Sequence, residues 1–260
     1  MAFIRPYQDS DFEACANICI ATLPPSLQHS PDIPPLTPYL WAHPYTHLSP
    51  RTAHVLDDGR GAAVGYCIGC PDVHAFVRRY PSYAASVLAQ DVPAPPQLET
   101  REPWLVEPAG APVLSSSMGG EEVGAGEGTK GGGGDEGEGE VEQQGGRRHM
   151  IVNPQALAQL AYRPDWALLD GKEHLHSRWR ATMHIDLLPA FQSQGWGRLL
   201  ISKFITSVRE SGEDFGEGVH IGVAGENGKV VGFYEKLGFR VMEAAEAGRG
   251  FTLVKDFEKT

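Results

Sequence analysis

Long apolar runs are absent from this chain of 260 residues. No stretch approaches the roughly 20 apolar residues that a membrane-spanning helix needs. The N-terminal sequence MAFIRPYQDSDF also lacks the apolar core of a secretory signal. We therefore expect a cytoplasmic or nuclear protein with no membrane partner, either a monomer or a homodimer.

Basic charge is scarce as well. The formal net charge is −11, and much of it lies between Gly119 and Gly146, where eight acidic residues accompany a single lysine. Neither this segment nor the rest of the chain offers the basic face that binds a phosphate backbone, so we expect no direct nucleic-acid partner. The acidic segment is either an interaction tail for basic partners or an inert linker.

Cysteine is limited to Cys15, Cys19, Cys67 and Cys70. In a reducing compartment these residues are expected to be free thiols. Their spacing admits a zinc site, but Cys67 and Cys70 lie in the strand-like run AAVGYCIGC, where an odd offset places them on opposite faces. We therefore predict small buried residues and no metal.

Apolar periodicity divides the chain into three parts. Residues 1–90 and 149–260 alternate predicted strands and helices, whereas residues 91–148 are proline-rich and then Gly/Glu-rich. Such low complexity buries too little apolar surface to offset its chain entropy, so a disordered insertion is predicted there.

The first part opens with a short strand, FIRPY, and a helix that Asp9 or Ser10 is predicted to cap. Residues 24–50 are dense in proline and aromatic residues, which predicts a structured loop with one short helix near Pro38. Two β-rich runs around Asp57-Asp58-Gly59 predict a hairpin, followed by a helix from Asp72.

The last part carries the informative junction IDLLPAFQSQGWGRLLISKFI, in which a predicted strand leads into a helix through Gln192-x-x-Gly195-x-Gly197. Two glycines at a helix start let the backbone approach a ligand, and the unpaired N–H groups attract anions. Two rival phosphate motifs fail. Leu200 stands where a dinucleotide-binding motif needs its third glycine, and Val230 follows Gly228-Lys229 where a P-loop needs Ser or Thr.

About thirty residues further on, Asn227 is followed by Phe233-Tyr234-x-Lys236-x-Gly238-Phe239. Together the two motifs resemble the acyl-CoA site of the GNAT superfamily of N-acetyltransferases. The resemblance implies a mixed α+β fold with a central, mostly antiparallel sheet of about seven strands, flanked by helices and splayed between its fourth and fifth strands. It also implies acetyl-CoA as co-substrate and an amine acceptor, either a small molecule or a lysine side chain.

Carried over residue by residue, the resemblance assigns the cofactor site to the splayed strand, the glycine turn and the later helix. The implied cofactor-binding residues are Ile185, Leu187, Leu188, Gln192, Ser193, Gln194, Gly195, Trp196, Gly197, Arg198, Asn227, Phe233, Tyr234 and Lys236.

The chemistry of acyl transfer to an amine needs a proton donor for the leaving thiolate and a base for the attacking amine. Tyr234 is the predicted donor. Three residues remain open as the base: His184 and Asp186, which alternate onto one face of the strand MHIDLLP, and Asp72, which follows the strand that ends at Cys70. A water molecule is a further alternative.

A wider resemblance covers most of the chain outside the insertion. The order of VLDDGRGAAVGYCIGCPDVHAF, ALAQL, HIDLLP and FYEKLGF is similar to the acetyltransferase-like domain of O-GlcNAcases and its separate bacterial relatives.

Two other functions compete with catalysis of acetyl transfer. The first is a catalytically inactive module of the same fold that binds acetyl-CoA or a peptide. The second is an iron oxygenase, because His184-x-Asp186 and His220 spell a 2-His-1-carboxylate set, although that set normally sits in an all-β barrel.

Overall fold

The computed structural model describes residues 1–108, 150–244 and 250–258. In these ranges the strands are β1 (Phe3–Pro6), β2 (His54–Asp57), β3 (Ala63–Cys70), β4 (Leu105–Val106), β5 (Ile151–Val152), β6 (Ala181–Leu187), β7 (Gly218–Val223), β8 (Arg240–Ala244) and β9 (Phe251–Asp256). The α-helices are α1 (Phe12–Ala21), α2 (Pro38–Trp41), α3 (His43–Leu48), α4 (Val73–Tyr83), α5 (Ala89–Asp91), α6 (Pro154–Tyr162), α7 (Pro164–Leu168), α8 (Glu173–His176), α9 (Trp196–Arg209) and α10 (Val231–Lys236). None of the helices described is long and apolar enough to span a bilayer.

A seven-stranded sheet with the order β1-β2-β3-β6-β7-β9-β8 forms the centre of the fold. Neighbouring strands are antiparallel except for β6 and β7, which run parallel. β6 pairs with β3 from Thr182 to Leu187, but with β7 only at Ala181 and Thr182. The fourth and fifth strands of the sheet therefore separate beyond Thr182, which confirms the predicted splay and the mostly antiparallel sheet.

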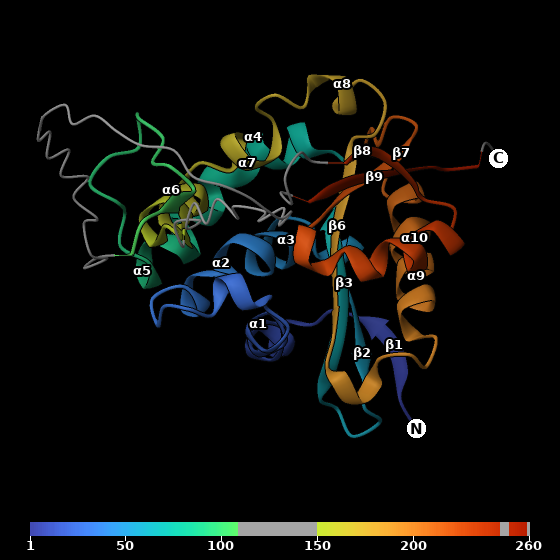
Figure 1. The fold of residues 1–260 in the computed structure, drawn as a ribbon. Helices are drawn as coiled ribbons and strands as arrows, with labels where there is room; N and C mark the ends of the chain where they lie inside the picture. Colours follow the sequence, from blue (N-terminus) through green and yellow to red (C-terminus); the bar gives the residue numbers. More distant parts are fainter. Residues whose placement is uncertain (109–149, 245–249, 259–260) are drawn as a thin grey trace, which may run out of the picture.

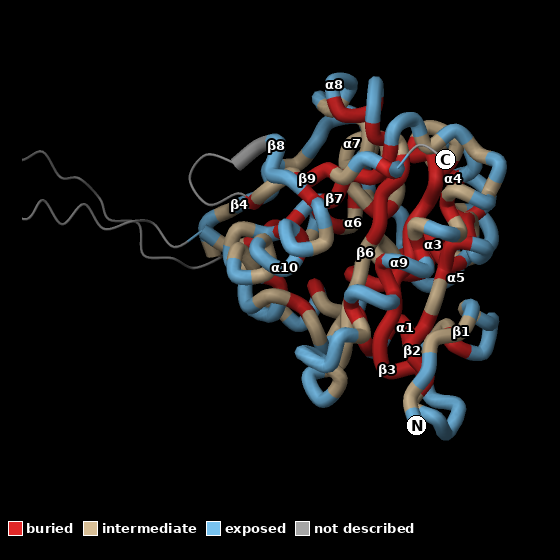
Figure 2. Tube along the Cα trace, turned by 90° about the vertical axis from the view of Figure 1, so that its right-hand side faces the viewer, coloured by how far each residue is buried: buried red, intermediate tan, exposed pale blue. Residues whose placement is uncertain are grey.

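Helices cover both faces of this sheet (Figure 1), with α1 to α4 on one face and α9 and α10 on the other. The side chains of β3 alternate between the two faces of the sheet, so this strand contributes to the core on both sides. Tyr66, Ile68 and Cys70 belong to the core beneath α1, α3 and α4, whereas Cys67 belongs to the core beneath α9. Cys67 and Cys70 thus lie on opposite faces, as predicted. In Figure 2 the buried chain follows β2, β3 and β6 through the middle of the molecule.

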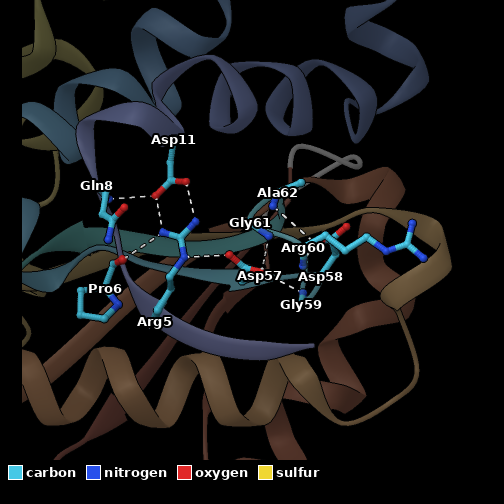
Figure 3. Close-up of polar contacts among 10 residues, drawn as sticks. All are labelled: Arg5, Pro6, Gln8, Asp11, Asp57, Asp58, Gly59, Arg60, Gly61 and Ala62. Carbon is cyan, nitrogen blue, oxygen red and sulfur yellow. Dashed lines mark hydrogen bonds and ion pairs between the residues drawn. The ribbon is translucent and has the colours of Figure 1, made fainter. Parts of the chain in front are cut away.

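Arg5 anchors the first strand to both neighbouring turns (Figure 3). Its guanidinium donates to both carboxylate oxygens of Asp11, at 2.6 and 2.8 Å, and to Oδ2 of Asp57 at 2.9 Å. Oδ1 of Asp57 accepts the backbone N–H of Gly59 at 2.8 Å inside the predicted hairpin. The hydrogen bond from Arg5 lowers the pKa of Asp57, so this carboxylate stays charged in the folded protein.

The first helix begins differently from the sequence prediction. Residues Asp9–Asp11 form a 3-10 turn, and α1 follows it from Phe12. The Asp11 carboxylate accepts the backbone N–H of Gln8 at 2.9 Å, so the turn starts after Gln8. The prediction that Asp9 or Ser10 caps the helix is wrong, because Asp11 supplies the carboxylate that closes this turn.

Residues 97–106, which lie inside the predicted insertion 91–148, are joined to α6 and β5. The Gln159 side chain accepts from the backbone N–H of Glu102 at 2.9 Å and donates to the Gln97 carbonyl at 3.0 Å. β4 then pairs with β5, which brings Val106 opposite Ile151. Of the predicted insertion 91–148, the residues from 109 onward lie outside the described residues, and the domain boundaries stay a prediction.

Candidate functional site

The splay gives β6 a free edge. The backbone N–H of Leu188 donates to the Val64 carbonyl at 3.0 Å, which places the even-numbered β6 residues in hydrogen-bonded pairs with β3. In an antiparallel ladder the alternate residues direct their N–H and C=O groups the other way. The backbone of Met183, Ile185 and Leu187 therefore faces the gap that β7 leaves. Ile185, Leu187 and the following Leu188 are half-buried there, at the positions predicted to line the cofactor.

The turn between β6 and α9 is held by its own side chains. The Gln192 amide donates to the Leu187 carbonyl at 2.7 Å, and the Gln194 amide donates to the Ala190 carbonyl at 2.6 Å. Ser193 has a φ of 59°, in the left-handed region that side chains rarely adopt. Residues 192–195 are exposed, and the first N–H groups of α9 have no partner within the helix. This arrangement suits an anion.

The two glycines of the motif serve different purposes. Gly195 caps α9 with a φ of 86°, and a Cβ there would meet open space. Gly197 is buried, and its Cβ would lie 3.0 Å from the Phe233 ring. Gly197 thus permits α10 to pack closely on α9, and its contact with a ligand stays a prediction.

Further predicted contacts surround this helix start. Trp196 is half-buried, whereas Arg198 and Lys236 are exposed, and the Phe233 side chain is 38% exposed. Asn227 is half-buried in the 3-10 segment Gly225–Val230. Arg198 is the third residue of α9, so an exposed cationic side chain lies close to the exposed turn 192–195.

Tyr234 is a buried residue of α10, flanked by the rings of Phe233 and Phe239 at centroid distances of 5.2 and 5.4 Å. Burial raises its pKa, and the proximity of Cys67 and Asp186 adds to the shift. The phenol is therefore neutral. Tyr234 belongs to the core beneath α9, whereas Asp186 bonds to Tyr66 on the opposite face of the sheet, so these two predicted proton-transfer residues lie on opposite faces, within electrostatic range of each other.

Asp186 and His184 point to the opposite face from Ile185, toward α1 and α3. The hydroxyl of Tyr66 donates to Oδ2 of Asp186 at 2.6 Å. Burial raises the pKa of Asp186. His184 lies 5.1 Å from the ring of Tyr45, and burial lowers its pKa to about 4. Burial thus disfavours the charged form of both groups.

Asp72 lies apart from this pair. It caps α4, where its carboxylate accepts the backbone N–H of His74 at 2.9 Å. In the ladder between β3 and β6, Cys70 pairs with Thr182 and Tyr66 pairs with Asp186. Asp72 follows Cys70, so it lies beyond one end of this ladder, and that end is four residues from Asp186. At about 3.3 Å per residue, that separation exceeds 10 Å.

His220 belongs to a different environment from Asp186. Its Nδ1 lies 2.9 Å from the Trp179 carbonyl, and its ring contacts that of His176. No group of three His, Cys, Asp or Glu side chains in the described part of the chain could hold a metal ion. Neither the iron set with His184 nor the four-cysteine set is assembled among these residues.

Tyr66 and Tyr45 are the neighbours that sequence reasoning missed. Both are fully buried. Their contacts with Asp186 and His184 depend on the register of β3 with β6 and on the position of α3. No local motif marks either residue, and only the pairing of MHIDLLP with GYCIGC would have identified Tyr66.

Three comparisons with known proteins bear on this site. Residues 88–239, more than half of the chain, match the model of the acetyltransferase (GNAT) family. The crystal structure of SsHAT is 27% identical, covers 98% of both chains and superposes with a TM-score of 0.66. A GCN5-related N-acetyltransferase from Kribbella flavida is 13% identical over 98% of both chains, with a TM-score of 0.42. A search of the curated proteins found no match. The SsHAT structure shares this fold along nearly the whole chain.

Proposed function

Since this chain belongs to the acetyltransferase (GNAT) family, whose members are acetyl-CoA-dependent N-acetyltransferases, we propose that its acceptor is a primary amine that attacks the thioester directly. The observation that carries this proposal is the free edge of β6, with a neutral buried phenol, Tyr234, on one face of the sheet and a half-buried carboxylate, Asp186, on the other. The phenol can donate a proton, and the carboxylate can accept one.

The residues present fit acetyl-CoA. The N–H and C=O groups of Ile185 and the N–H group of Leu187, which face the gap beside β6, would pair with the amide-bearing pantetheine arm, as a β-strand partner would. The exposed turn 192–195 and the N–H groups of Trp196 to Arg198 would hold the pyrophosphate at the start of α9. Leu188, Asn227, Phe233 and Lys236 are the further residues that the resemblance assigns to the cofactor. When bound, acetyl-CoA supplies the activated acyl group.

Asp186 acts in this proposal as the base. Its raised pKa brings the carboxylate closer to the pH at which an amine must be deprotonated, which favours proton transfer. An N–H group on the β6 edge stabilises the oxyanion, and Tyr234 gives its proton to the leaving thiolate. Burial lowers the pKa of His184 to about 4, and Asp72 is engaged at the start of α4.

The acceptor enters from the side of residues 24–50. Ser26 in this segment donates a hydrogen bond to Glu226, next to Asn227, so the segment reaches the turn predicted to contact the cofactor. A cationic amine is favoured by the negative charge of Asp186. Both a small amine and a lysine side chain satisfy this chemistry. The resemblance to the acetyltransferase-like domain of O-GlcNAcases stays a prediction.

Two substitutions test the proposed chemistry. Tyr234→Phe and Asp186→Asn each remove one proton-transfer group, so kcat should fall by roughly 10²- to 10⁴-fold. The Kd for acetyl-CoA, measured by calorimetry, should change by less than about three-fold, because neither substitution removes a backbone contact to the cofactor.

The readout is release of CoA thiol with a panel of polyamines, amino sugars and lysine peptides. Full activity of Asp186→Asn would reject Asp186 as the base. Tight acetyl-CoA binding with no thiol release above background from any amine would instead favour the catalytically inactive module.

A further inference from the structure

Tyr66 occupies a central place in β3. Its side chain is fully buried, and its hydroxyl donates to Oδ2 of Asp186 at 2.6 Å. The two residues are direct partners in the ladder between β3 and β6, in a part of the sheet where both strands are paired. Strand pairing therefore fixes both ends of this hydrogen bond.

On its own face of the sheet, Asp186 is lined by the thiol of Cys19 and the hydroxyl of Thr22 from α1 and by the imidazole of His184 two residues earlier. The thiol of Cys67 and the phenol of Tyr234 belong to the core on the opposite face and act on Asp186 electrostatically. Burial raises the pKa of both thiols and of the phenol, and it lowers that of His184 to about 4. All of these groups are neutral near pH 7.

Within such a neutral shell, hydrogen bonds are what offset the loss of solvation of the carboxylate. The Tyr66 hydroxyl is the donor with the shortest contact, and a charge-assisted hydrogen bond of this length is a strong one. Because Oδ2 is held in this way, the orientation of the carboxylate is fixed.

We propose that Tyr66 is a positioning residue, which holds the Asp186 carboxylate in one orientation and keeps it ionised facing the acceptor. This inference rests on the proposed function, in which Asp186 is the base. Tyr66 itself touches no reacting atom, so it acts only through Asp186.

The test is the pH dependence of kcat/KM for the acceptor in Tyr66→Phe. Loss of one hydrogen bond to the carboxylate should raise the pKa of Asp186 and move the acidic limb of the profile upward by on the order of one pH unit. Activity should recover toward the wild-type value above that limb, with KM for acetyl-CoA unchanged. A merely structural role would lower activity at every pH and leave the limb in place.

Tyr80→Phe is the matched control. Tyr80 is also a buried tyrosine, and its hydroxyl donates at 2.7 Å to the Ala161 carbonyl instead of to Asp186. The same hydroxyl is lost, so the stability change should be similar, but the acidic limb should not move. An equal shift in both variants would overturn the proposal.

A second measurement separates this inference from the proposed function. The side-chain carboxyl resonance of Asp186, assigned with Asp186→Asn, can be titrated by carbon NMR in the wild type and in Tyr66→Phe. An upward shift supports the proposal even in the absence of turnover, and an unchanged titration overturns it. If Asp186→Asn remains active, the assignment of the base fails, whatever the NMR titration gives.

Discussion

Gly195 allows the cofactor site to be tested separately from the stability of the fold. Gly195 and Gly212 both have positive φ values, 86° and 76°, and a Cβ at either position meets open space. Gly195 caps the start of α9, whereas Gly212 follows its end. The pair Gly195→Glu and Gly212→Glu therefore introduces the same side chain and the same backbone strain at opposite ends of one helix.

The two variants should lose similar stability. A side chain in the left-handed region costs about 1 to 2 kcal/mol. In a chain of this size each kcal/mol lowers Tm by roughly 2 to 4 °C. The helix dipole adds about 0.3 to 1 kcal/mol in favour of a carboxylate at the start and against one at the end, so Gly212→Glu should melt slightly lower.

Gly195→Glu and Gly212→Glu should differ in their affinity for acetyl-CoA. If the pyrophosphate binds at the start of α9, a glutamate at 195 lies within about 4 to 5 Å of it, where two like charges repel by roughly 1 to 4 kcal/mol. At 1.4 kcal/mol per ten-fold change, the Kd should rise at least about five-fold and as much as several hundred-fold. Gly212→Glu should bind as the wild type does.

Calorimetry at low and high salt is the assay, since screening should recover part of the loss in Gly195→Glu. Wild-type affinity in Gly195→Glu, with its Tm lowered as expected, would refute the placement of the pyrophosphate. An equal loss of affinity in Gly212→Glu would show that strain, and not charge at the site, is responsible.

Two predictions concern the scaffold. The pKa of Asp57 lies below its usual 3.8, so its bond with Arg5 stabilises the fold above about pH 4 and weakens as the pH falls through the lowered pKa. Thermal melts should therefore show Arg5→Gln below the wild type at pH 6, with the gap closing toward pH 3, and a constant gap would contradict this. Replacing residues 107–150 by Asn-Gly between Val106 and Ile151 should keep Tm within a few degrees, because these two residues already pair across a hairpin. Loss of folding would contradict that inference.

Much of the fold was predictable because its signals are local. The hairpin at Asp57-Asp58-Gly59 occurs as predicted. The start of α6 is marked just as locally, by the Asn153 cap and by Pro154 at its first position. The secondary structure of residues 24–50 was harder to predict. This segment was predicted to hold one short helix, yet it contains α2 and also α3. Pro44 lies in the first turn of α3, where a missing N–H costs nothing, so proline density did not exclude a helix.

The glycine turn of the candidate site could also be predicted from the sequence, because a positive φ favours glycine. The contact between Tyr66 and Asp186 leaves no such local signal, because it depends on the register of two strands that are more than a hundred residues apart. A slip of one residue would place Cys67 or Gly65 beside Asp186 and turn the tyrosine to the other face of the sheet. One strand register therefore determines the positions of the proposed base, of its hydrogen-bond donor and of the free edge of β6. A substitution that disturbs the pairing of β3 with β6 should affect the chemistry before it affects cofactor binding at the turn.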